Sequence, residues 1–141
     1  MSTLENLPEN SVCLTLRVRY AETDQMQRAY YGRFFEWFEA ARSEYCRTHK
    51  IRYMDLEEQG LFLPILEATC RYKGAARYDE EVHIYVYVKE IKKCMLRMGY
   101  RLFSEGREIA EGETLQMLIN TEGKPRSFPP DIATKFVSLA E

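Results

Sequence analysis

The chain has 141 residues, a length that suits one compact domain with a hydrophobic core. Hydrophobic residues make up 45% of it and charged residues 30%, which argues against a disordered chain. The formal net charge of -2 argues against a general affinity for nucleic acid or for an anionic membrane surface. We therefore expect a single globular domain over residues 1–141.

No apolar run approaches the roughly 20 residues that cross a bilayer, so we expect no membrane insertion. The opening segment, MSTLENLPENSV, is too polar and acidic for a signal peptide. The cysteines lie far apart and form no CxxC motif: Cys13, Cys46, Cys70 and Cys94. Such spacing is typical of reduced structural thiols in a cytoplasmic protein, and we expect neither a metal nor another cofactor.

The first predicted element is a strand over residues 12–20, VCLTLRVRY. Its alternate residues are apolar or aromatic and share one face: Val12, Leu14, Leu16, Val18 and Tyr20. This period of two is typical of a half-buried strand. A polar, turn-prone segment follows over residues 21–31 and contains Asp24.

Residues 32–50, GRFFEWFEAARSEYCRTHK, predict a long amphipathic helix with a bulky apolar face. The apolar positions recur at helical spacing: Phe34, Phe38, Ala41 and Tyr45. We interpret this stripe as the centre of the core rather than as a cofactor site. A short helical turn follows in YMDLEEQG and ends at Gly60.

The rest of the chain predicts antiparallel strands and a short C-terminal helix. The strands cover residues 61–72, 81–91, 94–103 and 108–120. Pro64 cannot donate a ladder hydrogen bond, so the first of them should be an edge strand or begin with a bulge. In residues 81–91 the inward positions are Val82, Ile84, Val86 and Val88. A hairpin turn is expected around Gly106.

This order of elements predicts an α+β fold in which about five antiparallel strands wrap around one long helix. Several strands carry apolar residues on their second face as well, among them Tyr85 and Tyr87. A sheet that is partly apolar on both faces often continues across a subunit interface. We therefore expect a homo-oligomer, either a homodimer or a homotetramer.

The segment YAETDQMQRAYYGRFFEWFEAARSEY resembles the signature of hotdog-fold acyl-CoA thioesterases of the 4-hydroxybenzoyl-CoA thioesterase type. The matching pieces are Glu22-Thr23-Asp24, Tyr30-Tyr31 and Phe38-Glu39-Ala40-Ala41-Arg42. YKGAARYDEEV, AEGET and GKPRSFP resemble later family segments, so the motif-bearing core covers about residues 12–131. Two positions depart from the pattern: many members have Gly in place of Gln27, and His or Asn in place of Tyr31.

The resemblance implies a hydrolase that converts an acyl-CoA into a free carboxylic acid and CoA. It makes Asp24 the nucleophile or general base, and the Tyr31 backbone N–H the donor to the oxyanion, with Gly32 beside it. Unpaired N–H groups at a helix start suit an oxyanion, and a glycine lets a substrate approach closely. Local sequence alone favours a cap or turn role for such an aspartate, but Asp24 lies several residues ahead of the predicted helix.

Coenzyme A carries phosphates, so a basic rim is expected around the site. Arg71, Lys73 and Arg77 are the candidates, although each also suits an ordinary solvated charge. An acyl-carrier-protein thioesterase and a non-catalytic acyl-CoA-binding module are the alternatives. A hydratase is less favoured because His49 and His83 lie away from Asp24 in the predicted order of elements. The sequence does not identify the acyl group.

Overall fold

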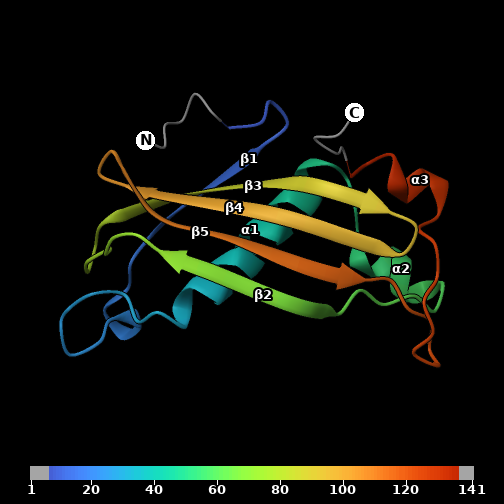
Figure 1. Ribbon diagram of the computed structural model, residues 1–141, viewed down its shortest axis with the longest axis horizontal. Helices are drawn as coiled ribbons and strands as arrows, with labels where there is room; N and C mark the ends of the chain where they lie inside the picture. The colour runs from blue at the N-terminus through green and yellow to red at the C-terminus, as the bar shows by residue number, and fades with distance from the viewer. Residues whose placement is uncertain (1–6, 137–141) are drawn as a thin grey trace.

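Antiparallel strands form one sheet, and a long helix lies across one face of it (Figure 1). The computed structural model describes residues 7–136. The strands are β1 (Val12–Arg17), β2 (Ile65–Tyr72), β3 (Glu81–Lys92), β4 (Met95–Ser104) and β5 (Arg107–Met117). The helices are α1 (Arg33–Thr48), α2 (Tyr53–Glu58) and α3 (Pro130–Ala133), and a 3₁₀ turn covers Tyr20–Glu22.

The sheet has the strand order β1-β3-β4-β5-β2, and every neighbouring pair is antiparallel. One row of paired residues crosses all of its strands: Val12, Val86, Tyr100, Gly112 and Cys70. Within the described residues, β2 pairs with β5 alone and its other edge is open. The prediction of an edge strand after Pro64 is confirmed.

Helix α1 packs its predicted apolar face against the sheet. The residues expected in the core are all buried: Phe34, Phe38, Ala41 and Tyr45. Phe38 stacks on Tyr100 of β4, with ring centroids 4.3 Å apart and ring planes at 7°. A Cβ on Gly112 of β5 would come within 2.4 Å of Phe38 Cζ. The helix lies this close to the sheet because β5 carries no side chain at that position.

The alternation of β3 is also as predicted, since the inward residues are fully buried: Val82, Ile84, Val86 and Val88. The helical turn after α1 is present as α2, and Gly60 beyond it has a φ of 75°. The α+β architecture of a helix wrapped by five antiparallel strands is therefore confirmed.

The first strand ends earlier than predicted. Strand β1 stops at Arg17, and Tyr20 lies in the 3₁₀ turn with 76% of its surface exposed. The Glu22 carboxylate accepts a hydrogen bond of 2.8 Å from the Arg19 N–H, which closes this turn and takes the chain out of the sheet. The prediction that Tyr20 shares the inward face of Val18 is wrong.

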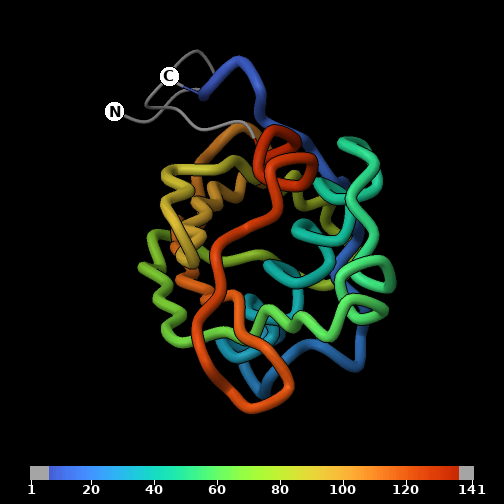
Figure 2. The backbone as a smooth tube through the Cα atoms, turned by 90° about the vertical axis from the view of Figure 1, so that its right-hand side faces the viewer, coloured from blue at the N-terminus to red at the C-terminus, as the bar shows by residue number. Residues whose placement is uncertain are grey.

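The two ends of α1 meet different parts of the chain (Figures 1 and 2). The segment between β1 and α1 lies beside the first turn of the helix, whereas α2 and α3 lie near its last turn. At that second end, Lys135 donates a hydrogen bond of 2.9 Å to the Lys50 carbonyl. No helix in residues 7–136 is long and apolar enough to cross a membrane.

Candidate active site

The chain between β1 and α1 folds into a tight hairpin that carries Asp24. Thr23 pairs with Ala29, and the Asp24 N–H donates to the Arg28 carbonyl at 2.8 Å. At the tip, the Gln27 N–H donates to the Asp24 carbonyl at 3.0 Å, and Gln27 has a φ of 64°. Glycine adopts this left-handed conformation without steric strain, whereas for another residue the conformation costs roughly 1 kcal/mol of conformational free energy. Gln27 therefore makes a turn that favours the glycine found in many related sequences.

The Asp24 carboxylate has one oxygen in the turn and one outside it. Oδ1 accepts hydrogen bonds from the N–H groups of Met26 at 2.8 Å and Arg28 at 3.3 Å. Oδ2 accepts none from residues 7–136. The turn role expected of such an aspartate is therefore real, and it leaves a second oxygen free to act on another molecule.

Unpaired backbone donors lie at the start of α1. The Arg33 N–H is paired, because it donates a hydrogen bond of 2.9 Å to the Tyr30 carbonyl. The N–H groups of Tyr31 and Gly32 have no acceptor among the described residues. The Tyr31 carbonyl is held by the Tyr72 hydroxyl, which donates to it at 2.7 Å. The peptide that presents the Gly32 N–H is thus fixed against strand β2.

A cavity of about 180 Å³ brings Asp24 and Tyr31 together. It is lined by Asp24, Arg28, Ala29, Tyr31, Phe34, Tyr72, Gly74 and Ala75. Larger hollows of about 480, 490 and 270 Å³ lie elsewhere, and none of these is lined by Asp24 or Tyr31. We assign the candidate site by its chemistry rather than by volume, because the cavity of about 180 Å³ is lined both by a carboxylate with a free oxygen and by residues at a helix start.

The three cations predicted for a basic rim do not lie together around the cavity. Successive residues of a strand point to opposite faces, so Arg71 lies away from Tyr72 and the cavity. Lys73 contacts Glu108 at 3.1 Å and Glu111 at 3.3 Å, and Arg71 lies 3.8 Å from Glu111. These two cations are therefore partly neutralised by carboxylates of β5.

Arg77 lies in the loop between β2 and β3, beside the hairpin of Asp24. It forms an isolated antiparallel bridge with Arg28, which itself lines the cavity. Neither arginine forms an ion pair with any residue in the range 7–136. Sequence reasoning missed Arg28 because its proximity to Arg77 arises only from the pairing of two loops.

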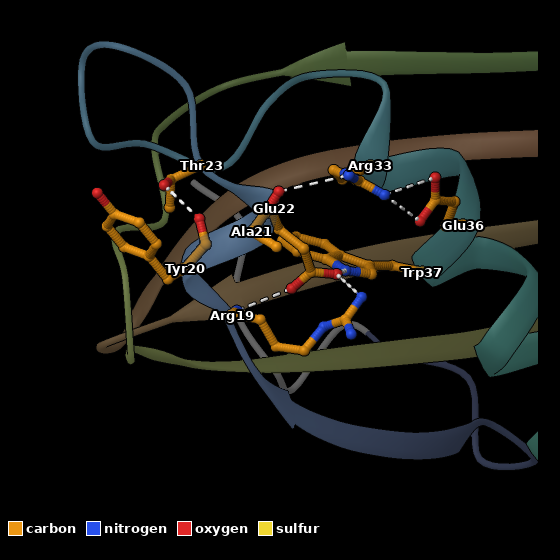
Figure 3. A network of polar contacts seen from close by, with 8 residues as sticks. All are labelled: Arg19, Tyr20, Ala21, Glu22, Thr23, Arg33, Glu36 and Trp37. Atoms are coloured by element: carbon orange, nitrogen blue, oxygen red, sulfur yellow. Dashed lines mark hydrogen bonds and ion pairs between the residues drawn. The ribbon is translucent and has the colours of Figure 1, made fainter.

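Glu22 was predicted to shape the turn before Asp24, but sequence reasoning missed its contact with α1. Its side chain is buried, and it accepts hydrogen bonds from the Arg19 N–H at 2.8 Å and from Trp37 Nε1 at 3.1 Å (Figure 3). Burial alone would raise the pKa of Glu22, but these hydrogen bonds and the Arg19 charge outweigh it and lower the pKa below the usual value. Glu22 is therefore a buried carboxylate held in its charged form.

The two histidines lie outside the cavity. His49 follows α1, where its ring stacks on Tyr45, and burial lowers the pKa of its imidazole. His83 lies on β3 and shares a hydrogen bond of 2.9 Å with Thr15 of β1. No group of three or more His, Cys, Asp or Glu side chains in the described part of the chain is arranged to hold a metal ion.

The sequence model of the thioesterase-like superfamily matches residues 18–136. The chain belongs to this family. The recognition from the motifs is thereby confirmed, as are the hotdog fold and the thioesterase class of enzyme. The match includes the hairpin of Asp24 and the whole of α1.

Relatives and solved structures agree with this family. The acyl-CoA thioesterase YbgC of Haemophilus influenzae is 27% identical over 133 residues, which cover 93% of this chain and 98% of that protein. A DHNA-CoA thioesterase structure from Staphylococcus aureus has a TM-score of 0.84 and 29% identity, covering 89% of this chain and 88% of that one. The crystal structure of a hypothetical protein from Thermus thermophilus has a TM-score of 0.82 and 29% identity, covering 88% of this chain and 95% of that one.

Proposed function

We propose that the protein hydrolyses acyl-CoA thioesters to a free carboxylic acid and CoA. The observation that carries this proposal is one cavity lined both by Asp24, whose Oδ2 is free, and by Tyr31, whose N–H group is unpaired like that of the adjacent Gly32. Thioester hydrolysis needs these two parts, a nucleophile or base and donors for the oxyanion. The names of the relatives from Haemophilus influenzae and Staphylococcus aureus, both CoA thioesterases, support the choice of substrate class.

In the proposed reaction the thioester carbonyl accepts hydrogen bonds from the Tyr31 and Gly32 N–H groups. The positive end of the α1 dipole stabilises the oxyanion that forms on this oxygen. Asp24 acts in one of two ways. Its Oδ2 attacks the carbonyl carbon and expels the CoA thiolate, leaving a mixed anhydride that water then cleaves, or it removes a proton from the water that attacks.

The test is release of free thiol from a panel of aryl and fatty acyl-CoAs. The Asp24→Asn substitution keeps the shape of the turn but removes the nucleophile or base, so kcat should fall about 10²- to 10⁴-fold. Asp131→Asn, on the exposed surface of α3, is the matched control and should leave the rate unchanged. Circular dichroism must show that each variant is folded.

Each outcome has a definite meaning. Equal hydrolysis by wild type and Asp24→Asn would remove Asp24 from the mechanism. Wild-type binding of acyl-CoA without turnover would favour the alternatives, a thioesterase for acyl-carrier protein or a non-catalytic binding module. The panel also ranks aryl against fatty acyl groups, a choice for which the sequence carries no signal.

We also propose that the active form is a homo-oligomer. The cavity of about 180 Å³ is small for an acyl-CoA, since pockets for drug-sized ligands enclose about 300–1,000 Å³. Beside it, the open edge of β2 exposes apolar side chains, including Ile65, Leu66 and Tyr72. A second subunit placed there would deepen the cavity and cover this edge. The cytoplasmic location and the single domain over residues 1–141 stay predictions.

A further inference from the structure

We propose that Glu22 is a positioning residue that fixes Asp24 relative to the oxyanion donors of Tyr31 and Gly32. This inference rests on the proposed thioesterase function. The Glu22 carboxylate lies outside the cavity, and its role is to keep the Asp24 carboxylate at a fixed position relative to the oxyanion donors.

The first support is the place of Glu22 in the chain. Its carbonyl accepts a hydrogen bond of 2.8 Å from the Tyr30 N–H, which closes the base of the hairpin. Asp24 follows Glu22 by two residues, and Tyr31 follows Tyr30 directly. The hydrogen bond between the peptide groups of Glu22 and Tyr30 is therefore the cross-link of the hairpin next to the donors of Tyr31 and Gly32, and it lies two residues from Asp24.

The second support is the side chain, which connects this cross-link to α1. The Glu22 carboxylate accepts from Trp37 Nε1 at 3.1 Å and from the Arg19 N–H at 2.8 Å (Figure 3). Trp37 lies on α1, little more than one turn beyond Gly32. A single residue thus links the segment after β1, the base of the hairpin and the helix that begins beside the cavity.

The third support is that every neighbour of this carboxylate is a donor. Oε1 faces the Arg19 N–H, while Oε2 faces Trp37 Nε1 and the Arg19 guanidinium, which lies 3.5 Å away. A glutamine would place its own NH₂ group against one of these donors and lose at least one hydrogen bond. The site therefore needs a carboxylate, although no reacting atom touches it.

A neighbouring link is weaker. Arg33 donates to the Ala21 carbonyl at 3.4 Å and pairs with Glu36 at 3.0 Å (Figure 3). The Glu36 side chain is 57% exposed, and exposed ion pairs contribute little to stability. The buried Glu22 contacts are thus the stronger connection between hairpin and helix.

The central experiment compares wild type with Glu22→Gln, Trp37→Phe and the double variant. Displacing a reacting group by about 1 Å can cost about 100-fold in rate. We expect Glu22→Gln to lower kcat about 10- to 100-fold with KM nearly unchanged, because the cavity itself is intact. If both residues act through one contact, the double variant should be little slower than the slower single variant.

The matched control is Glu44→Gln. Glu44 also lies on α1 and pairs with Arg47 at 2.8 Å, but this pair is at the far end of the helix. Its kcat and KM should equal those of wild type. Thermal melts must accompany the kinetics, so that rates are compared only at temperatures where each variant is fully folded.

A second readout does not depend on activity. The chain has one tryptophan, so ¹⁵N labelling gives one indole N–H signal. A hydrogen bond to a carboxylate should shift this signal downfield, and Glu22→Gln should move it back, whereas Glu44→Gln should not.

The results separate the two proposals. An active wild type whose kcat survives Glu22→Gln would overturn the positioning role alone, as would an indole signal that does not move. A wild type that hydrolyses no thioester would overturn the proposed function and, with it, this role of Glu22.

Discussion

Arg28 lines the cavity of Asp24 and is paired with Arg77 across an isolated bridge, and no carboxylate within residues 7–136 forms an ion pair with either arginine. Two adjacent like charges are unfavourable unless an anion joins them. In the proposed function that anion is a phosphate of CoA. Of the three cations predicted from the sequence, Arg77 is thus better placed for this contact than Arg71 and Lys73, which face carboxylates of β5.

Removing either arginine should weaken the binding of CoA esters selectively. A hydrogen bond to a charged group contributes about 1.5–3 kcal/mol, so Arg28→Ala or Arg77→Ala should raise KM for acyl-CoA about tenfold. The same variants should act normally on acyl N-acetylcysteamine, a thioester without phosphates. Arg126→Ala, in the exposed loop after β5, is the control. An equal loss on both substrates would contradict a phosphate contact.

How much of the site was predictable differs from residue to residue. Asp24, Tyr31 and Gly32 were found because a motif and the general chemistry of helix starts coincide there. The contacts of Glu22 with Trp37 and of Arg28 with Arg77 join residues that are 15 and 49 positions apart. No local pattern encodes such contacts, because they depend on how the hairpin packs on the rest of the fold.

At the scale of the elements, Gly112 of β5 lies directly against Phe38 of α1. An added Cβ would lie 2.4 Å from Phe38 Cζ and 2.6 Å from the Thr69 carbonyl oxygen. The Phe38 ring cannot move freely, because it is stacked on Tyr100. The glycine therefore sets the distance between helix and sheet.

We expect Gly112→Ala to lower the free energy of unfolding by about 1–3 kcal/mol, the usual cost of overpacking a core. Gly99→Ala is a matched control on β4. Its Cβ would meet the Tyr87 ring at 2.5 Å, but that ring is only half-buried and can turn toward solvent. Urea denaturation measures the free energy of unfolding of both variants. Equal stability of Gly112→Ala and wild type would show that α1 moves away from the sheet at little cost.

The spacing of apolar residues predicted the strands and helices well where it was regular. It failed where a side-chain hydrogen bond ended a strand. The alternation of β3 and the helical spacing of α1 both lead directly to buried faces. The end of β1 is different: the apolar pattern continues to Tyr20, but the Glu22 carboxylate turns the chain at Arg19. A single hydrogen bond of this kind leaves no periodic trace in the sequence.

At the scale of the whole molecule, the open edge of β2 predicts self-association. Leu66 is 50% exposed there, and unpaired strand edges pair readily with other strands. We expect wild type to be a dimer or tetramer by light scattering, and Leu66→Glu to shift it toward monomer. Cys13→Glu, on the opposite edge strand β1, should not. A monomeric wild type with full activity would contradict the oligomer proposal.

The oxyanion donors in the proposed mechanism belong to the backbone, and this has an evolutionary consequence. Every residue except proline carries a peptide N–H, so almost any substitution at position 31 preserves the donor. Tyr31 is 62% exposed, so the core places little restriction on its side chain. Natural selection can therefore exchange this side chain to suit a new acyl group, while the contact that stabilises the transition state is inherited without change.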